Sequence, residues 1–250
     1  MSSQLRRWLL FGGSIGVFIA LISATDLWQS LLGTLFPGER HVLHPRAALP
    51  VFVWEHVQLV AISSSLTVLV GVPVGIWVTR ASGRSFLPII SDLSSFGQTF
   101  PPVAVLALAV PALGFGLTPT IVALFLYGML PVVRNTIAGL QAVPGDAVEV
   151  ADGMGMSRRQ VLFRVELPLA APVILAGVRM SVVINIGTAM IGAAIGAGGL
   201  GSPVIAGLVQ DNLAFVLEGA VPAAFLALLA DQLLANLEGL FAYPGGGLGT

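Results

Sequence analysis

Three glycines in the C-terminal third of the chain have the spacing of a dinucleotide-binding loop. The stretch AAIGAGGLGSPVIAGLVQ (193–210) contains G-x-G-x-x-G at Gly196, Gly198 and Gly201, after an apolar run and before a helix-like stretch. An acid, Glu218, follows 17 residues later. In a Rossmann fold these positions hold a pyrophosphate at a helix N-terminus and a ribose hydroxyl at the acid. Nucleotide binding is therefore the first hypothesis.

The composition of the chain argues against a soluble nucleotide-binding domain. Of the 250 residues, 56% are hydrophobic and only 9% are charged, and the mean hydropathy is +0.95. A soluble domain carries about 25% charged residues. Because so few charges cannot cover a water-facing surface, we expect an all-α integral membrane protein.

Several residue types are missing, and their absence excludes further kinds of chemistry. All eleven basic residues are arginines, so the chain has no P-loop, whose lysine reaches the phosphates. Cysteine is absent, which excludes disulfides and thiolate sites. The net charge of −1 argues against a nucleic-acid partner. His41 and His44 lie in a polar segment that we interpret as a solvated loop, so no metal site is expected.

Six apolar stretches are long enough to cross a hydrocarbon core of about 30 Å, which takes roughly 20 helical residues. Asp92, Gln98 and the pair Pro101-Pro102 interrupt the third stretch, and a broken span of that kind often lines a pathway. We therefore expect about six transmembrane helices, near residues 8–25, 57–79, 87–110, 116–133, 170–195 and 213–236.

The arginines predict the orientation of the spans. With a cytoplasmic N-terminus, eight arginines lie inside and two lie outside, which is a clear positive-inside bias. Both termini are then cytoplasmic, and residues 134–169 form a cytoplasmic loop. A cleaved signal peptide beginning at Arg6-Arg7 is the alternative for the first span, and the membrane-embedded remainder of the chain disfavours it. The inside arginines are Arg6, Arg7, Arg80, Arg84, Arg134, Arg158, Arg159 and Arg164; the outside ones are Arg40 and Arg46.

The cytoplasmic loop contains signals for two short helices at the membrane surface. Asp146 and Glu149 have the spacing of a capping box at the start of the first helix, and Ser157 begins the second with Gln160 at the reciprocal position. Glycines at 153 and 155 separate the two. A connection of this length with two capped helices is longer than most idle loops, which favours a docking element for a cytoplasmic partner.

The stretch EVADGMGMSRRQVLFRVELP resembles the EAA loop of ABC-importer permeases: E-A-A, three residues, Gly, nine residues, an aliphatic, any residue, then Leu-Pro. Val150 and Val165 replace the usual alanine and isoleucine, and both remain apolar. Other stretches, such as EHVQLVAISSSLTVLVGVPVGI and INIGTAMIGAAIGAGGLG, resemble the osmoprotectant branch, whose members import glycine betaine, choline or carnitine. The similarity covers roughly residues 55–238. The matching loop residues are Glu149, Val150, Ala151, Gly155, Val165, Leu167 and Pro168.

The resemblance implies a non-catalytic permease in a bacterial or archaeal inner membrane, which forms the pathway for a compatible solute. It implies three kinds of partner: a second permease subunit, two ATP-binding cassette subunits and an external solute-binding protein. ATP and Mg would bind the ATPase, and this chain would hold no cofactor. The expected units are residues 1–56 (first span and external segment), 57–238 (permease domain with the EAA loop at 146–168) and 239–250 (glycine-rich tail).

Three groups of candidate residues follow from the resemblance and from the cost of polar groups inside a membrane. The candidates for contact with the ATPase are Glu149, Ala151, Asp152, Gly155, Arg158, Arg159, Leu167 and Pro168. Those for the substrate pathway are Gln98, Thr99, Phe100, Asn185 and Thr188, for which interhelical hydrogen bonding is an equal alternative. Gly198, Gly199 and Gly201 would form a tight turn on the external side, as part of an outer gate, where no cytoplasmic dinucleotide reaches them.

Three other functions remain open at this point. An importer for another small molecule, such as an amino acid, would share the scaffold. A secondary transporter driven by an ion gradient would need ionisable residues deep in spans, and Asp92, Arg179, Glu218 and Asp231 approach this. An intramembrane enzyme is disfavoured, because no paired acids, H-E-x-x-H motif or Ser/His pair occurs within the spans.

Overall fold

The computed structural model describes residues 3–97 and 101–241, and those residues are almost entirely helical, without a β-strand. The helices are α1 (Ser3–Ser23), α2 (Thr25–Leu35), α3 (Leu49–Thr79), α4 (Leu87–Gly97), α5 (Pro102–Leu113), α6 (Leu117–Gln141), α7 (Gly145–Gly153), α8 (Arg158–Val161), α9 (Leu167–Gly192), α10 (Gly201–Gln210) and α11 (Leu213–Phe241).

Five described helices are long and apolar enough to cross a membrane, and they match five of the six predicted spans. They are Gln4–Ser23, Leu49–Thr79, Leu117–Gln141, Arg158–Ile195 and Leu213–Phe241. The predicted span 87–110 instead forms two shorter helices, α4 and α5, on either side of residues 98–100. Pro101 is extended and Pro102 begins α5, because a residue before proline is disfavoured in helical geometry. The break therefore occurs where the prolines interrupt the apolar run.

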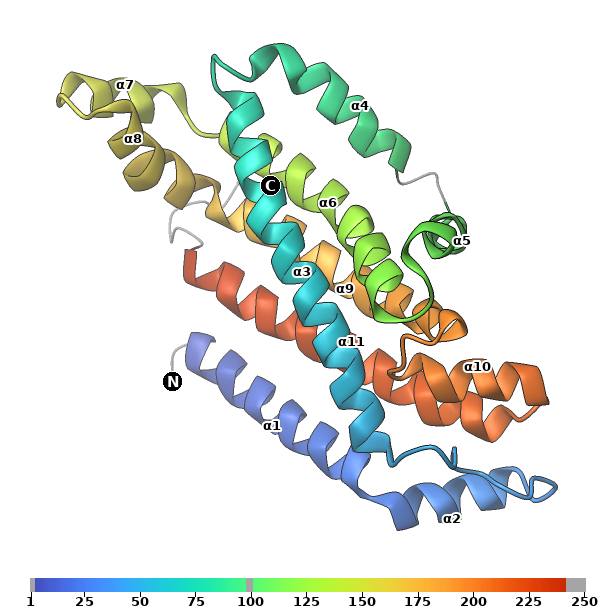
Figure 1. The fold of residues 1–250 in the computed structure, drawn as a ribbon. Helices are drawn as coiled ribbons and strands as arrows, with labels where there is room; N and C mark the ends of the chain where they lie inside the picture. The colour runs from blue at the N-terminus through green and yellow to red at the C-terminus, as the bar shows by residue number, and fades with distance from the viewer. Residues whose placement is uncertain (1–2, 98–100, 242–250) are drawn as a thin grey trace.

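The long helices form one bundle, with α9 in contact with α3, α6 and α11 (Figure 1). Small residues allow the close crossings: a Cβ atom at Gly75 of α3 would lie 2.6 Å from Cβ of Thr136 on α6. α1 packs on α11 at the edge of the bundle, where the side-chain amide of Gln4 donates to the carbonyl of Gly239. The described ends of the chain therefore lie at the same end of the bundle.

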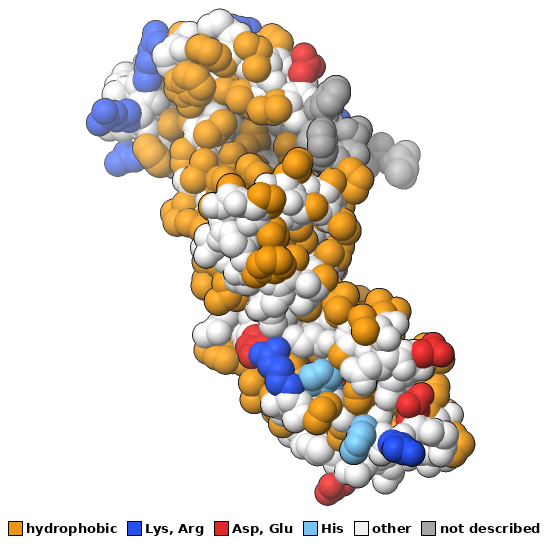
Figure 2. All heavy atoms as spheres, turned by 45° about the vertical axis from the view of Figure 1, so that its right-hand side comes forward, with side chains coloured by type: hydrophobic (Ala, Val, Ile, Leu, Met, Phe, Trp, Pro, Cys, Tyr) orange, Lys and Arg blue, Asp and Glu red, His pale blue; other side chains and the backbone are white. Residues whose placement is uncertain are grey.

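The two ends of the molecule carry different elements. α7 and α8 project from one end, and α2 and α10 lie at the other (Figure 1). Charged side chains gather at these ends on the face shown in Figure 2, with a broad hydrophobic region between them. This is the distribution that a protein crossing a hydrocarbon core requires.

Candidate functional site

The corner between α7 and α8 depends on one glycine. Gly155 has φ +77°, a left-handed conformation that residues with a side chain rarely adopt. Its N–H donates to the carbonyl of Asp152, and the next N–H, of Met156, reaches back 3.2 Å to the carbonyl of Ala151. These bonds satisfy carbonyls that the end of α7 leaves free. The predicted break between two helices is confirmed, with the left-handed residue at Gly155.

One of the two predicted helix caps is confirmed and the other is wrong. Ser157 and Gln160 form the full capping box at the start of α8. α7, however, begins at Gly145 with Pro144 as its N-cap, so Asp146 already lies in the first helical turn. Its carboxylate accepts a hydrogen bond from the N–H of Ala147. Pro144 has φ −59°, which suits the residue that leads into a helix, and the helix therefore starts two residues earlier than expected.

The second short helix is not separate from the membrane span, which corrects the expectation of two isolated surface helices. α8 continues through a π-helical segment (Leu162–Glu166) into α9, so that Arg158–Ile195 forms one helix of 38 residues. Pro168 lies in the first turn of α9 and has no N–H to donate to the preceding turn. A local π turn accommodates that missing bond. Leu167 is half-buried beside it. The corner thus lies at the N-terminal end of the same helix that crosses the bundle.

The predicted coupling residues divide into two groups by burial. Ala151 of α7 and Val161 of α8 are both buried, and the two helices are in contact. Charged side chains are exposed at Glu149, Asp152, Arg158 and Arg159. Three large apolar side chains are exposed among them, at Val150, Met154 and Phe163, with 61%, 65% and 65% of their surface accessible. Sequence reasoning missed these exposed apolar side chains, although apolar residues in an otherwise polar loop were a signal for them.

An ion pair at the base of the corner was also missed. Nη1 of Arg80, at the C-terminal end of α3, donates to both carboxylate oxygens of Glu166 at 2.9 and 2.8 Å. The Glu166 side chain is 14% exposed and lies in the π-helical segment. The pair therefore connects the end of α3 to the point where the corner joins α9.

A polar layer lies inside the bundle between α3, α6 and α9. The side-chain amide of Asn185 donates to Oγ of Ser64, and Thr67 donates to the carbonyl of Ser63. Gly128 of α6 packs directly on this layer, since a Cβ atom there would lie 2.6 Å from Oγ of Ser181. Asn185 therefore makes the interhelical hydrogen bond that was one of its two predicted roles.

The other predicted pathway residues have different outcomes. Thr188 is 8% exposed and lies one helical turn from Asn185 on α9. Gln98, Thr99 and Phe100 lie outside the described residues. Contact of any of these residues with a solute stays a prediction.

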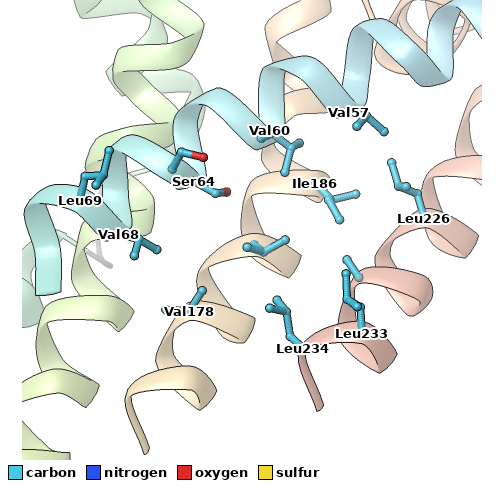
Figure 3. Close-up of a pocket in the computed structure, with 14 residues that line it drawn as sticks. Val57, Val60, Ser64, Val68, Leu69, Val178, Ile186, Leu226, Leu233 and Leu234 are labelled. Carbon is cyan, nitrogen blue, oxygen red and sulfur yellow. The ribbon is translucent and has the colours of Figure 1, made fainter. Parts of the chain in front are cut away.

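An apolar groove of about 770 Å³ runs along α3, α9 and α11 (Figure 3). Ser64 and Ser65 are the polar residues among the side chains that line it, and Ser64 is also the acceptor for Asn185. One hydrogen bond thus connects the polar layer to the groove. The remaining lining residues are Val57, Val60, Ala61, Val68, Leu69, Val178, Val182, Ile186, Leu226, Ala230, Leu233 and Leu234.

The glycine motif forms a tight turn at the end of the bundle opposite α7 and α8 (Figure 1). Gly196, Gly198 and Gly199 all have positive φ. Position 201 requires a residue without a side chain for a different reason: a Cβ atom there would lie 2.1 Å from the carbonyl oxygen of Met190. The N–H of Gly199 donates to Oε2 of Glu55 at 2.7 Å.

The dinucleotide hypothesis is wrong for this turn. The run before it is the helix α9 rather than a strand, and the trailing acid, Glu218, lies inside α11. Glu55 already accepts from the N–H of Gly199, and Glu55 also pairs with Arg46, which donates to Ser202. These contacts fasten the turn to α3 and to the segment between α2 and α3.

Comparison with known proteins decides the family. A family model described as the binding-protein-dependent transport system inner membrane component matches residues 71–242. The chain belongs to this family. The osmoprotectant import permease protein OsmY of Salmonella typhimurium is 40% identical over 219 residues, which cover 88% of this chain and 90% of that relative. The choline transport system permease protein OpuBB of Bacillus subtilis is 41% identical over 185 residues, covering 74% and 84%.

Solved structures of permeases show the same fold. The inward-facing MetNI methionine ABC transporter matches with a TM-score of 0.66 at 23% identity, over 76% of this chain and 94% of that one. An amino acid ABC transporter solved with histidines matches with a TM-score of 0.58 at 20% identity, over 77% and 92%. The predicted all-α integral membrane fold is confirmed. The permease is a multi-pass, non-catalytic inner-membrane component of an ABC importer.

Proposed function

We propose that this permease forms the pathway for an osmoprotectant, with glycine betaine, choline or carnitine as its substrate class. The observation that carries this proposal is the 40% identity with an osmoprotectant import permease along nearly the whole of both chains. Relatives named for choline and for glycine betaine, carnitine and choline together support the same class. The structural neighbours named for amino acids are less than 25% identical, so they support the fold and not an amino acid as substrate.

The α7–α8 corner would dock on a separate ATPase on the cytoplasmic side. Its exposed apolar patch (Val150, Met154 and Phe163) has the character of the buried centre of a protein interface. Charged side chains around it would form the polar rim, at Glu149, Asp152, Arg158 and Arg159. This orientation puts both described ends of the chain in the cytoplasm and the glycine turn outside, in agreement with the arginine distribution.

Movement of the docked corner would reach the bundle through α9. Because α8, the π segment and α9 are one helix, a tilt at the corner also tilts the residues that carry Asn185 and the groove. The turn that follows the C-terminal end of this helix would be part of an outer gate, formed by Gly198, Gly199 and Gly201. A second permease subunit would complete the pathway, and Salmonella typhimurium has two separate relatives, named OsmY and OsmW, which supports a pair of related chains.

Reconstitution tests the proposal directly. The permease is co-purified with its ATPase, placed in liposomes and supplied with the external binding protein and either choline, glycine betaine, carnitine or methionine. We expect ATP turnover and uptake to rise with one or more of the first three solutes and not with methionine. Arg158→Glu with Arg159→Glu should abolish co-purification with the ATPase, whereas Arg40→Glu at the opposite end should not. Uptake that depends on an ion gradient and not on ATP would contradict the proposal.

A further inference from the structure

A second cavity, separate from the groove, opens at the end of the molecule that carries α2 and α10. Its volume is about 360 Å³, which is within the range of small-ligand pockets. Its rim consists of exposed residues such as His41 and Pro45, whereas its floor is almost fully buried, with Trp28 at 5% and Glu218 at 2% exposure. The full lining is Thr25, Trp28, His41, Leu43, His44, Pro45, Ala47, Ala48, Leu49 and Glu218.

The carboxylate at the floor has a hydrogen bond but no cationic partner among the described residues. Oε2 of Glu218 accepts from the backbone N–H of His44 at 2.7 Å. Arg46, two residues further, is paired with Glu55 instead. Burial, together with the charge of Arg46, lowers the pKa of the His44 imidazole below its ordinary value and so disfavours the cationic form of this ring. A buried carboxylate without a positive partner is costly, because the lost hydration is not replaced.

The walls of the cavity have the chemistry that recognises an organic cation. The indole of Trp28 lines the cavity, and its N–H donates to the carbonyl of Leu21, which fixes the ring. The imidazole of His44 makes edge-to-face contacts with Phe52 and Phe215, with the ring centroids 5.4 Å apart in each pair. An aromatic face together with a carboxylate favours a quaternary ammonium group. A small metal cation would need several oxygen ligands, and no group of three metal-ligating side chains occurs in the part of the chain that the structure describes.

We infer that this cavity is an external binding site for a quaternary ammonium compound, with the Glu218 carboxylate as its counter-ion and Trp28 as its aromatic wall. The chemistry of the site is independent of the proposed function, whereas its external position and the choice of choline as the probe rest on that proposal. It lies apart from the groove, because the two share no lining residue. The segment that forms its rim also carries Arg46, which pairs with the glutamate that holds Gly199. Binding here would therefore contact the segment that fastens the outer turn.

Equilibrium binding tests the site without transport. Radiolabelled choline is titrated onto the permease–ATPase complex in nanodiscs, without nucleotide and without the binding protein. We expect saturable binding that tetramethylammonium displaces and that KCl at the same ionic strength does not. Glu218→Gln should weaken binding by about tenfold or more, and Trp28→Leu by about tenfold, whereas Trp28→Phe should keep most of it. Asp26→Asn is the matched control, because Asp26 is an exposed acid on α2 that does not line the cavity.

The outcomes separate the site from the proposed function. If Glu218→Gln binds choline like the wild type, the carboxylate is neutralised by a proton or has a structural role, and the inference is wrong. If Glu218→Gln does not fold, Glu218→Asp keeps the charge and should still bind, and loss of binding in that folded variant would overturn the inference. Choline-stimulated uptake without binding at this cavity would leave the function intact and remove the site. Binding at this cavity without any choline-stimulated ATP turnover would support the site and contradict the proposed function.

Discussion

Gly155 allows the sharpest test of how the α7–α8 corner works. Its φ of +77° is unfavourable for any residue with a Cβ atom, but the space around it is open, because no heavy atom lies within 4 Å of the place that a Cβ atom would occupy. Gly155→Ala therefore adds backbone strain without a steric clash. Gly153, two residues earlier, has the same open surroundings and no positive φ. Gly153→Ala is thus a matched control that differs in the backbone conformation alone.

The expected effect follows from the cost of the left-handed conformation. An L-residue there loses about 1–2 kcal/mol, which shifts the population of the intact corner by roughly 5- to 30-fold relative to competing conformations. Asparagine tolerates this region better, so Gly155→Asn should recover part of the loss. The bundle itself does not depend on this residue, so the melting temperature of the complex should change little. We expect ATP hydrolysis to continue while solute uptake falls, because the tip of α9 is no longer held in the docking geometry.

The assay is the ratio of solute taken up to ATP hydrolysed in proteoliposomes. Wild type and Gly153→Ala should give the same ratio, Gly155→Ala a clearly lower one and Gly155→Asn an intermediate one. A bulkier substitution, Gly155→Leu, should give nearly the same ratio as Gly155→Ala, because the position has free space. Equal ratios for all five proteins would refute the reasoning that the left-handed turn maintains coupling.

Three further predictions concern stability. Glu166→Gln should destabilise the complex by about 1–3 kcal/mol, which lies between the values for exposed and buried ion pairs. A double-mutant cycle with Arg80→Ala should show that the two residues are energetically coupled. Gly201→Ala puts a Cβ atom 2.1 Å from a carbonyl oxygen and should lower the free energy of unfolding by about 3 kcal/mol or more. Gly196→Ala meets no atom within 4 Å and should lower it by about 1–2 kcal/mol, and thermal unfolding measures both. Because burial lowers the pKa of His44, the unfolded state binds a proton at this imidazole more readily than the folded state does. The segment between α2 and α3 should therefore become less stable as the pH falls below about 6.5, and amide exchange of residues 36–48 at pH 5.5 and 7.5 measures this.

The spans and the corner were predictable because local chemistry determines them. Apolar runs of the required length give the crossing helices, and the Ser157 capping box and the glycine at 155 act within four residues of chain. The prolines at 101 and 102 likewise indicated where the third span breaks. Each of these signals is a property of neighbouring residues, and no distant partner is needed to interpret it.

The contacts that join distant segments were not predictable in the same way. Arg80 and Glu166 are 86 residues apart, and Glu218 accepts from a residue 174 positions earlier. The sequence places each charge near the end of a span but does not say which ends meet. Glu218 was also misleading as the acid of a nucleotide motif, because its spacing from the glycines matches a strand–helix unit that a membrane helix cannot form. Only the packing of α11 against the segment between α2 and α3 shows that Glu218 lines a cavity.

The continuity of α8 with α9 changes how the two ends of the permease are related. Two separate surface helices would have isolated the corner from the bundle, and any movement would have passed through a flexible joint. One helix of 38 residues instead begins at the corner and ends at Ile195, directly before the glycine turn. Arg80–Glu166 holds it near its start, and Glu55 holds the turn after its end. Because Glu55 lies in the first two turns of α3 and Arg80 directly follows its last residue, we expect a tilt of α9 relative to α3 to strain one of these contacts or both. The Arg80–Glu166 and Glu55–Gly199 contacts are therefore the two places at which we expect a movement of α9 to be transmitted to α3.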